Sequence, residues 1–398
     1  MECKGVKAIL AIAAILFLLV GQSSLSKRSK CYDECYPKCR SQDNPVWLCK
    51  YKCTLDCLIP ISAAKVDSGC SLACAKSSCG QHDIRPEGID MAACLSQCSK
   101  SCTKLTGEHQ DLLRVLRNAT MNDKTVILTA LNEAWAKPNS VLDLFLESFH
   151  IGEQTEQLLN HLVIIAMDPK AFERCKSVHA HCYFLTTEAV DFTAEKRHSS
   201  QDYLRMKWRR LEFLRVILEL GYNFLFTDMD VMWFRNPFSH FSSNADITFS
   251  TDGFNGNPSD VNNWPNNGFV YVRSCDQTIE FYKYWCFARS LYPGLSEQTV
   301  LNKIKYDNVA RINQRIRFLD TAYFGGFCQP SKDFNKVCTM HANCCIDIDT
   351  KLHDLRILLA DWKNYTSRTA EERKLGGFSW RIPDKCNMES LQRSTPEY

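Results

Sequence analysis

The chain has 398 residues, of which 45% are hydrophobic and 23% charged, and a formal net charge of only +3. This length is enough for two or three domains, and the balance of residue types indicates a folded rather than a disordered chain. The small net charge gives no reason to expect a nucleic-acid partner, and we predict none.

The first residues have the pattern of a targeting segment. Lys4 and Lys7 precede an apolar stretch over residues 8–20, and small or polar residues follow. This stretch is shorter than the roughly 20 residues that a membrane-spanning helix needs. We predict that residues 1–24 form a signal peptide, cleaved near Ser23 or Ser24. An uncleaved signal anchor is the alternative, in which case the protein would contact a membrane through this segment alone.

Residues 25–105 are rich in cysteine. Twelve of the 22 cysteines lie between Cys31 and Cys102, a density typical of proteins that fold in an oxidising compartment. They form four triplets, three of them with the i, i+4, i+8 spacing that aligns side chains along one face of a helix. We therefore expect a small segment of disulfide-stapled helical hairpins, whose connectivity the sequence does not determine. Zinc binding is the alternative, although only His82 accompanies these thiols. The segment loosely resembles the thionin-like plant peptides.

Residues 106–398 alternate between apolar segments and amphipathic helices. This alternation predicts an α/β fold with a mostly parallel central sheet. Ligands of such sheets bind beyond the carboxyl ends of the strands, so we expect the site to follow Thr129, Thr227 and Phe249. The main predicted helices cover residues 141–149 and 202–220, with Gly221 placed to end the second, and the predicted strands cover residues 125–129, 161–166, 182–185, 223–227, 246–250 and 269–272.

Two carboxylates, Asp228 and Asp230, come directly after the apolar strand 223–227. Such groups at the end of a buried strand are costly unless a positive charge lies beside them. Mn²⁺ and Mg²⁺ prefer carboxylate and phosphate oxygens, so the pair could hold a cation that bridges the two phosphates of a nucleotide diphosphate. A D-x-D triplet alone is more often a solvated loop or a helix cap, and only its position after the strand favours the metal site.

Five stretches of residues 124–398 resemble the plant nucleotide-diphospho-sugar transferases of glycosyltransferase family 77. They are KTVILTALNEAW (124–135), FLESFHIGEQTEQLLNHLVIIAMD (145–168), YLRMKWRRLEFLRVILELGYNFLFTDMDVMWFRNPF (203–238), NNGFVYVRS (266–274) and TMHANCC (339–345). The resemblance implies a glycosyltransferase A-type nucleotide-sugar fold, a divalent cation, usually Mn²⁺, and a retaining transfer from a UDP-sugar donor. It also implies a cell-wall polysaccharide or glycoprotein acceptor and a place in the Golgi lumen or elsewhere in the secretory pathway. Two N-glycosylation sequons, at Asn118 and Asn364, are compatible with that route.

The same resemblance assigns the metal ligands. Asp228 and Asp230 match the metal-binding triplet of the family, and His341 matches its C-terminal histidine. Two other interpretations of His341 stay open: an ordinary surface histidine, or a zinc ligand together with Cys338, Cys344 and Cys345. In an oxidising compartment those cysteines are better explained by disulfides, with separate partners for the two adjacent ones.

Other residues are candidates for donor binding and catalysis. Glu297 and Gln298 fall where the family places its catalytic polar residue, although Glu297 is also explained as a favourable charge at a helix N-terminus. The Asn266–Gly268 segment could instead be a plain turn at the start of a strand. Lys207 and Arg210 could instead be solvated charges. The candidate donor-binding residues are Thr129, Asn132, Lys207, Arg210, Asp228, Asn266, Asn267 and Gly268.

The nucleophile of a retaining transfer is not identified by the sequence. Asp252 and Asp260 are candidates, but we interpret both as solvated turn residues beside Gly253 and Pro258. In the alternative mechanism the acceptor attacks from the same face that the diphosphate leaves. That mechanism needs no protein nucleophile, and the sequence does not decide between the two.

Two other functions compete with a glycosyltransferase. A signal peptide leading into a disulfide scaffold is also the pattern of a secreted cysteine-rich peptide, here fused, naturally or as an artefact of joining two genes, to an inactive transferase domain. The third possibility is a sugar-binding protein that keeps the fold without turnover.

Overall fold

The structure, a computed structural model, describes residues 34–41, 110–186, 200–307 and 315–386. The chain divides into two compact units, Met1–Thr106 and Gly107–Tyr398. In the first unit, residues 34–40 form a helix on which Cys35 and Cys39 lie one turn apart, and both are disulfide-bonded. The predicted signal segment and the other cysteines of residues 25–105 lie outside the described residues.

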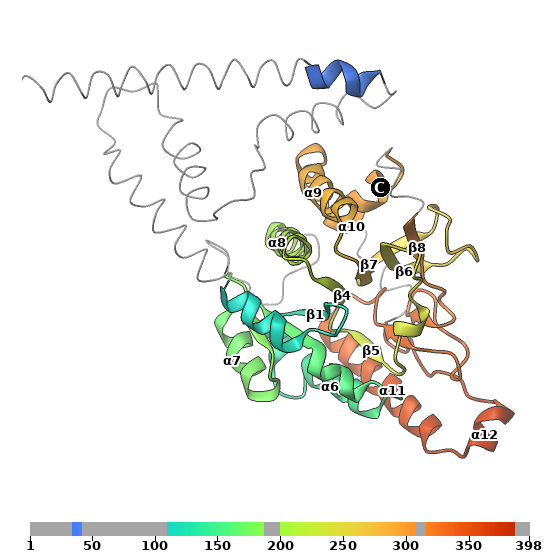
Figure 1. Cartoon of the computed structure of the whole chain (residues 1–398). Helices are drawn as coiled ribbons and strands as arrows, with labels where there is room; N and C mark the ends of the chain where they lie inside the picture. Colours follow the sequence, from blue (N-terminus) through green and yellow to red (C-terminus); the bar gives the residue numbers. More distant parts are fainter. Residues whose placement is uncertain (1–33, 42–109, 187–199, 308–314, 387–398) are drawn as a thin grey trace, which may run out of the picture. The chain divides into compact units, whose positions relative to one another are not determined.

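The second unit is built on a mixed sheet of seven strands in the order β3-β2-β1-β4-β7-β6-β8 (Figure 1). Four of the six strand pairings are parallel, and β7 is antiparallel to both of its neighbours. The predicted α/β fold with a mostly parallel sheet is therefore confirmed. The strands are β1 (Thr125–Leu131), β2 (Leu162–Ala166), β3 (Cys182–Phe184), β4 (Asn223–Thr227), β6 (Ile247–Gly253), β7 (Trp264–Val272) and β8 (Ile316–Phe318).

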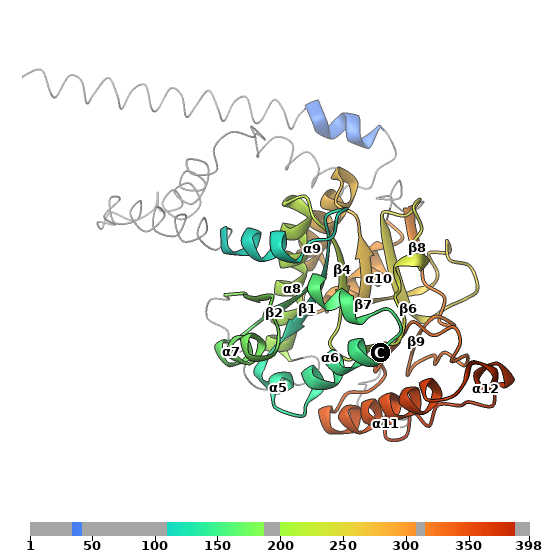
Figure 2. The same cartoon turned by 60° about the horizontal axis from the view of Figure 1, so that its bottom comes forward.

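Helices cover both faces of this sheet (Figures 1 and 2). One face carries α8 (Gln201–Glu219), α9 (Asp276–Leu291) and α10 (Glu297–Ile304), and the other carries α6 (Val141–Ile151) and α7 (Pro169–Val178), with α11 (Ile348–Thr366) beside α6. Because both faces are covered, β2 is apolar throughout and all five of its residues are buried. The shorter helices are α5 (Glu133–Ala136), η2 (Glu156–His161), η3 (Phe238–His240) and α12 (Ala370–Leu375), and residues 110–119 form a further helix.

Helix α8 shows how local sequence sets an element's limits. The hydroxyl of Ser200 accepts a hydrogen bond from the backbone N–H of Tyr203 and so caps the first turn. After the last turn, Gly221 adopts φ +82°, a conformation that favours glycine. The prediction of a helix over residues 202–220 ended by Gly221 is confirmed to within one residue.

Both neighbouring strands are longer than predicted. Asn266–Gly268 lie inside β7, so the alternative of a plain turn before that strand is wrong, and Asp252, which was expected in the loop after β6, lies inside β6. The physical reason is tertiary pairing. Ser250, Thr251 and Gly253 pair with the first residues of β7 across an irregular register, which extends both strands beyond their apolar runs.

A second, three-stranded sheet has the order β5-β10-β9, with β5 spanning Val231–Trp233, β9 Phe324–Gly326 and β10 Thr339–His341. β10 is antiparallel to β5, and this pairing places His341 opposite Val231, next to Asp230. The sequence predicted none of these strands, because segments of three residues are too short to show a periodic pattern.

Disulfides anchor the segments around β10. Cys344 pairs with Cys328 and Cys345 with Cys386, while Cys338 is a free, buried thiol. The interpretation of Cys344 and Cys345 as bridged to separate partners is confirmed, and the alternative of a zinc site with His341 is wrong. A third bridge joins Cys175 to Cys182.

Within the part of the chain that the structure describes, no helix is both long enough and apolar enough to cross a membrane.

Candidate active site

The two carboxylates of the D-x-D triplet lie at the carboxyl end of β4. The backbone N–H of Asp228 donates a hydrogen bond to the carbonyl of Gly268 in β7. The backbone carbonyl of Asp230 accepts one from Ala342, the residue after β10. The Asp228 side chain is 22% exposed and that of Asp230 only 4%. Both sheets therefore hold the triplet in place, and the first carboxylate is the more accessible.

His341 joins these carboxylates, as the sequence analysis expected. The candidate ligand atoms of Asp228, Asp230 and His341 all lie within 4.8 Å of one another. His341 Nε2 is 3.2 Å from Asp230 Oδ1. Burial alone would lower the pKa of His341, but the adjacent Asp230 carboxylate raises it above its ordinary value. Carboxylate oxygens suit Mg²⁺ and Mn²⁺, so this group could hold such an ion.

Lys351 is a site residue that the sequence analysis missed. It lies in the first turn of α11, and its Nζ is 2.5 Å from Asp230 Oδ2. Burial alone would raise the pKa of Asp230, but the ammonium of Lys351 and the imidazole of His341 hold it well below its usual range. Lys351 lies 121 residues from Asp230 along the chain and belongs to no motif, so no sequence pattern identifies it.

Arg210 of α8 connects Asp228 to Glu297 at the start of α10. Its Nη1 lies 2.6 Å from Asp228 Oδ1 and its Nη2 lies 2.8 Å from Glu297 Oε1. The guanidinium also stacks over the Phe226 ring, 4.6 Å from the ring centroid. Burial would lower the pKa of Arg210, but the two carboxylates raise it. The alternative that Arg210 is a solvated charge is therefore wrong.

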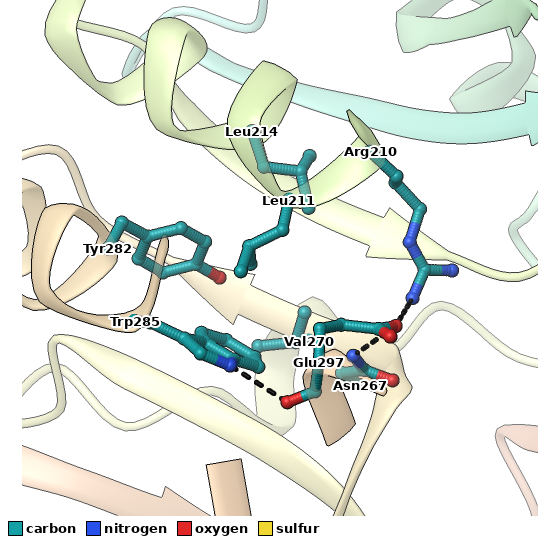
Figure 3. A pocket seen from close by; sticks show the side chains of 8 residues that line it. All are labelled: Arg210, Leu211, Leu214, Asn267, Val270, Tyr282, Trp285 and Glu297. Atoms are coloured by element: carbon teal, nitrogen blue, oxygen red, sulfur yellow. Dashed lines mark hydrogen bonds and ion pairs between the residues drawn. The ribbon is translucent and has the colours of Figure 1, made fainter. Parts of the chain in front are cut away.

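Glu297 is held from several sides. It is 1% exposed, its Oε1 also accepts a hydrogen bond from Asn267 Nδ2, and its backbone carbonyl accepts one from the Trp285 indole. Figure 3 shows Arg210 and Asn267 both pointing at the Glu297 carboxylate. A favourable helix-dipole charge does not by itself explain this arrangement, because such a charge needs no buried partners.

A small closed cavity lies behind this carboxylate. Its volume of about 10 Å³ is roughly that of one water molecule. Two buried polar atoms of its lining, Glu297 Oε2 and the Tyr282 hydroxyl, have no hydrogen-bond partner among the described residues. The lining comprises Arg210, Leu211, Leu214, Asn267, Val270, Tyr282, Trp285 and Glu297 (Figure 3).

Asp252 organises a second polar cluster beside the first. Its Oδ1 accepts hydrogen bonds from Asn266 Nδ2 at 2.6 Å and Asn343 Nδ2 at 2.7 Å, and its Oδ2 accepts a longer one from Gln298 Nε2 at 3.3 Å. Gln298 Oε1 in turn accepts from the backbone N–H of Asn267. The interpretation of Asp252 as a solvated turn residue is therefore wrong.

Asp260 behaves differently, as the sequence predicted. Its carboxylate accepts hydrogen bonds from Asn255 and Asn262 of its own loop. It therefore orders a turn, and no bond joins it to the residues around Asp228 in the described structure.

Gly268 lets β7 approach the triplet. A Cβ atom there would lie 2.6 Å from His341 Cε1, 2.7 Å from Asp228 Oδ2 and 2.8 Å from Asn266 Oδ1, all closer than van der Waals contact allows. The glycine is thus needed for close packing of the protein's own side chains.

The remaining candidates are less closely connected. Thr129 is fully buried in β1, two residues before the strand ends at Leu131. Asn132 caps α5, with its Oδ1 accepting a hydrogen bond from the Trp135 N–H. Lys207 lies close enough to Asp228 and Glu297 for their charges to raise its pKa, although burial and Arg210 oppose this.

Comparisons with known proteins identify the family of this chain. Residues 157–355 match the family model described as nucleotide-diphospho-sugar transferase. An uncharacterised protein of Arabidopsis thaliana is 45% identical over 293 residues, which cover 72% of this chain and 77% of the relative. A UDP-D-xylose:L-fucose alpha-1,3-D-xylosyltransferase of the same plant is 27% identical over 135 residues, 33% of this chain and 35% of the relative. The solved structure of mouse xyloside xylosyltransferase 1 aligns with 56% of this chain and 99% of its own, at 12% identity and a TM-score of 0.36. The chain belongs to the nucleotide-diphospho-sugar transferase family and is a glycosyltransferase.

Proposed function

We propose that this glycosyltransferase moves a sugar from a UDP-sugar to a cell-wall polysaccharide or glycoprotein, with retention of configuration, using Mn²⁺ or Mg²⁺. The observation that carries the proposal is the convergence of Asp228, Asp230 and His341 within 4.8 Å at the carboxyl end of β4. These residues would hold the ion, which supplies positive charge to the diphosphate of the donor. The Arabidopsis relative that takes its sugar from UDP-D-xylose supports a UDP-sugar donor.

The surrounding side chains orient the donor site. Arg210 fixes Asp228 through a short charged hydrogen bond, and Lys207 adds positive charge nearby for the anionic donor. Glu297 is too buried to contact a sugar, and its bonds to Arg210 and Asn267 give it a positioning role. Gln298 is only half-buried, so its amide is the better candidate for contact with the donor sugar.

The protein's disulfides support a place in the secretory pathway. Three disulfides lie among the described residues of the transferase unit. Such bridges form and persist in oxidising compartments, which supports the Golgi lumen or another part of the secretory route, with secretion as the alternative.

The test is donor hydrolysis by the full chain, secreted from a eukaryotic host. A panel of UDP-sugars is screened with Mn²⁺ and with chelator, and the active donor is then given to the double variant Asp228→Ala, Asp230→Ala. We expect Mn²⁺-dependent hydrolysis by the wild type and a loss of at least about 100-fold in the variant. Asp260→Ala is the matched control, since that carboxylate bonds only within its own loop.

Two results would contradict the proposal. Wild-type protein that hydrolyses no UDP-sugar would exclude a UDP-sugar as the donor, and undiminished hydrolysis in the double variant would exclude a need for metal binding by these carboxylates. Circular dichroism checks that each variant is folded.

A further inference from the structure

Trp264, the first residue of β7, is an exposed aromatic side chain next to the candidate active site. Its exposure is 68%, whereas Trp208, Trp233, Trp285 and Trp362 are each at most 2% exposed. Single exposed apolar residues are common on protein surfaces, so exposure alone decides nothing. The position of this ring and the hydrogen-bonded loop before it are the observations that indicate a role in binding.

Trp264 lies at the sheet edge that carries the site. It pairs with Gly253 at the carboxyl end of β6, one residue beyond Asp252. Four residues further along β7, Gly268 packs against Asp228 and His341. Four residues of extended strand span at most about 13 Å, so the indole lies within reach of a short oligosaccharide whose end is at the metal-binding group.

The loop that precedes Trp264 is held by several hydrogen bonds. Asn263 is 1% exposed; its Oδ1 accepts a hydrogen bond from the N–H of Asn255, and its Nδ2 donates to the carbonyls of Asn257 and Asp260. Lys305 Nζ at the end of α10 also donates to the Asn263 carbonyl, at 2.8 Å. An exposed ring on a preorganised frame loses little conformational entropy when a ligand binds, which favours affinity.

The segments that adjoin Trp264 carry neutral polar groups as well as two charges. Tyr306 is 54% exposed, and its hydroxyl donates to Asn262 Oδ1 at 3.4 Å. The nearby charges of Lys305 and Asp260 are already engaged with Asn263 and with their own loop. An aromatic face beside amide and hydroxyl groups suits a ligand with an apolar C–H face and a rim of hydroxyls. A neutral sugar ring has both, and the ammonium of Lys305, which is 6% exposed, presents little positive charge to an acidic glycan.

We propose that Trp264 is the stacking platform of the acceptor site and that the acceptor is a neutral glycan. This inference rests on the proposed function, because a glycosyltransferase needs an acceptor, and it adds the chemical class of that acceptor and the residue that binds it.

The experiment measures binding of the full chain to an array of neutral plant cell-wall oligosaccharides, fragments of arabinan, xylan and galactan. We expect the wild type to bind at least one of them and Trp264→Ala to bind it about tenfold or more weakly, the effect of losing an aromatic anchor. Trp264→Phe should recover part of the affinity, because it restores an aromatic face. Phe287→Ala removes an exposed ring from α9, 37% exposed, and should bind as the wild type does. Thermal unfolding confirms that each variant is folded.

The outcomes separate this inference from the proposed function. Equal binding by Trp264→Ala and wild type, or no binding by the wild type to any fragment, overturns the platform. Wild-type hydrolysis of UDP-sugars is measured in parallel. Hydrolysis without Trp264-dependent binding would support the proposed function and contradict the stacking platform. Trp264-dependent binding without hydrolysis would contradict the proposed function and support a glycan-binding surface.

Discussion

Lys351 and Asp230 form a buried ion pair between the first turn of α11 and the residues after β4. The ammonium Nζ lies 2.5 Å from Oδ2, and the two side chains are 9% and 4% exposed. A lysine in this position balances a carboxylate that is also a candidate metal ligand. Loss of this pair should therefore change both the stability of the fold and the net charge at the candidate metal site.

The first prediction is that Lys351→Met destabilises the chelator-treated protein by about 3–5 kcal/mol, because it leaves a buried carboxylate without its partner. Added Mn²⁺ should restore part of this loss, so that the rise in Tm on adding Mn²⁺ is larger in the variant than in the wild type. Lys363→Met is the control on the same helix. Its side chain is 53% exposed, so loss of its ion pair with Glu147 should cost at most about 1 kcal/mol. Equal losses in the two variants would mean that the Lys351 pair is not buried in solution.

The second prediction concerns the close approach of β7 to the triplet. Gly268→Ala puts a Cβ atom within 2.8 Å of Asp228, His341 and Asn266, so these side chains must shift. We expect weaker Mn²⁺ binding, measured by electron paramagnetic resonance, and a fall in donor hydrolysis of about 100-fold, the typical effect of a displacement of about 1 Å at a catalytic centre. Gly253→Ala in β6 is the matched control, because nothing lies within 4 Å of the added atom. Unchanged Mn²⁺ affinity in Gly268→Ala would contradict the prediction, because it would mean that β7 can shift away from Asp228 and His341 without displacing them.

The third prediction concerns the Tyr282 hydroxyl, which is buried without a partner in the described residues. Removing it by Tyr282→Phe should leave the free energy of unfolding unchanged or raise it by up to about 1 kcal/mol, since an unpaired buried hydroxyl is unfavourable. Tyr284→Phe, on the same helix, removes a hydroxyl that donates to Asp307 Oδ2 at 2.7 Å and should lose about 1–2 kcal/mol. Urea unfolding measures both. A comparable loss in Tyr282→Phe would contradict the prediction and place an ordered water in the cavity beside Glu297.

Local chemistry determined what could be predicted from the sequence. Strands β2 and β4 follow from continuous apolar runs, and α8 from its amphipathic period and Gly221. The triplet was expected at the site because parallel strands present their carboxyl ends at one edge. Family resemblance, rather than spacing, added His341.

The rest depended on contacts that no local pattern encodes. Asn266–Gly268 have the composition of a turn, yet pairing with β6 draws them into a strand. The sequence predicted Asp252 to be a loop carboxylate. In the structure, three separate segments bring Asn266, Gln298 and Asn343 to it. Lys351 and Tyr282 carry no motif, and tertiary packing alone brings them to the site.

The neighbouring half-cystines Cys344 and Cys345 give the far C-terminal segment an influence on His341. Cys345 is bridged to Cys386, and the buried Asp354 accepts hydrogen bonds from the backbone N–H groups of residues 384–386. One of the two bridges that secure the segment after His341 therefore forms only after synthesis has passed residue 386. A recombinant fragment that stops short of Cys386, or that matures in a reducing host, would lack an anchor of the segment next to His341, however distant the cut is in sequence.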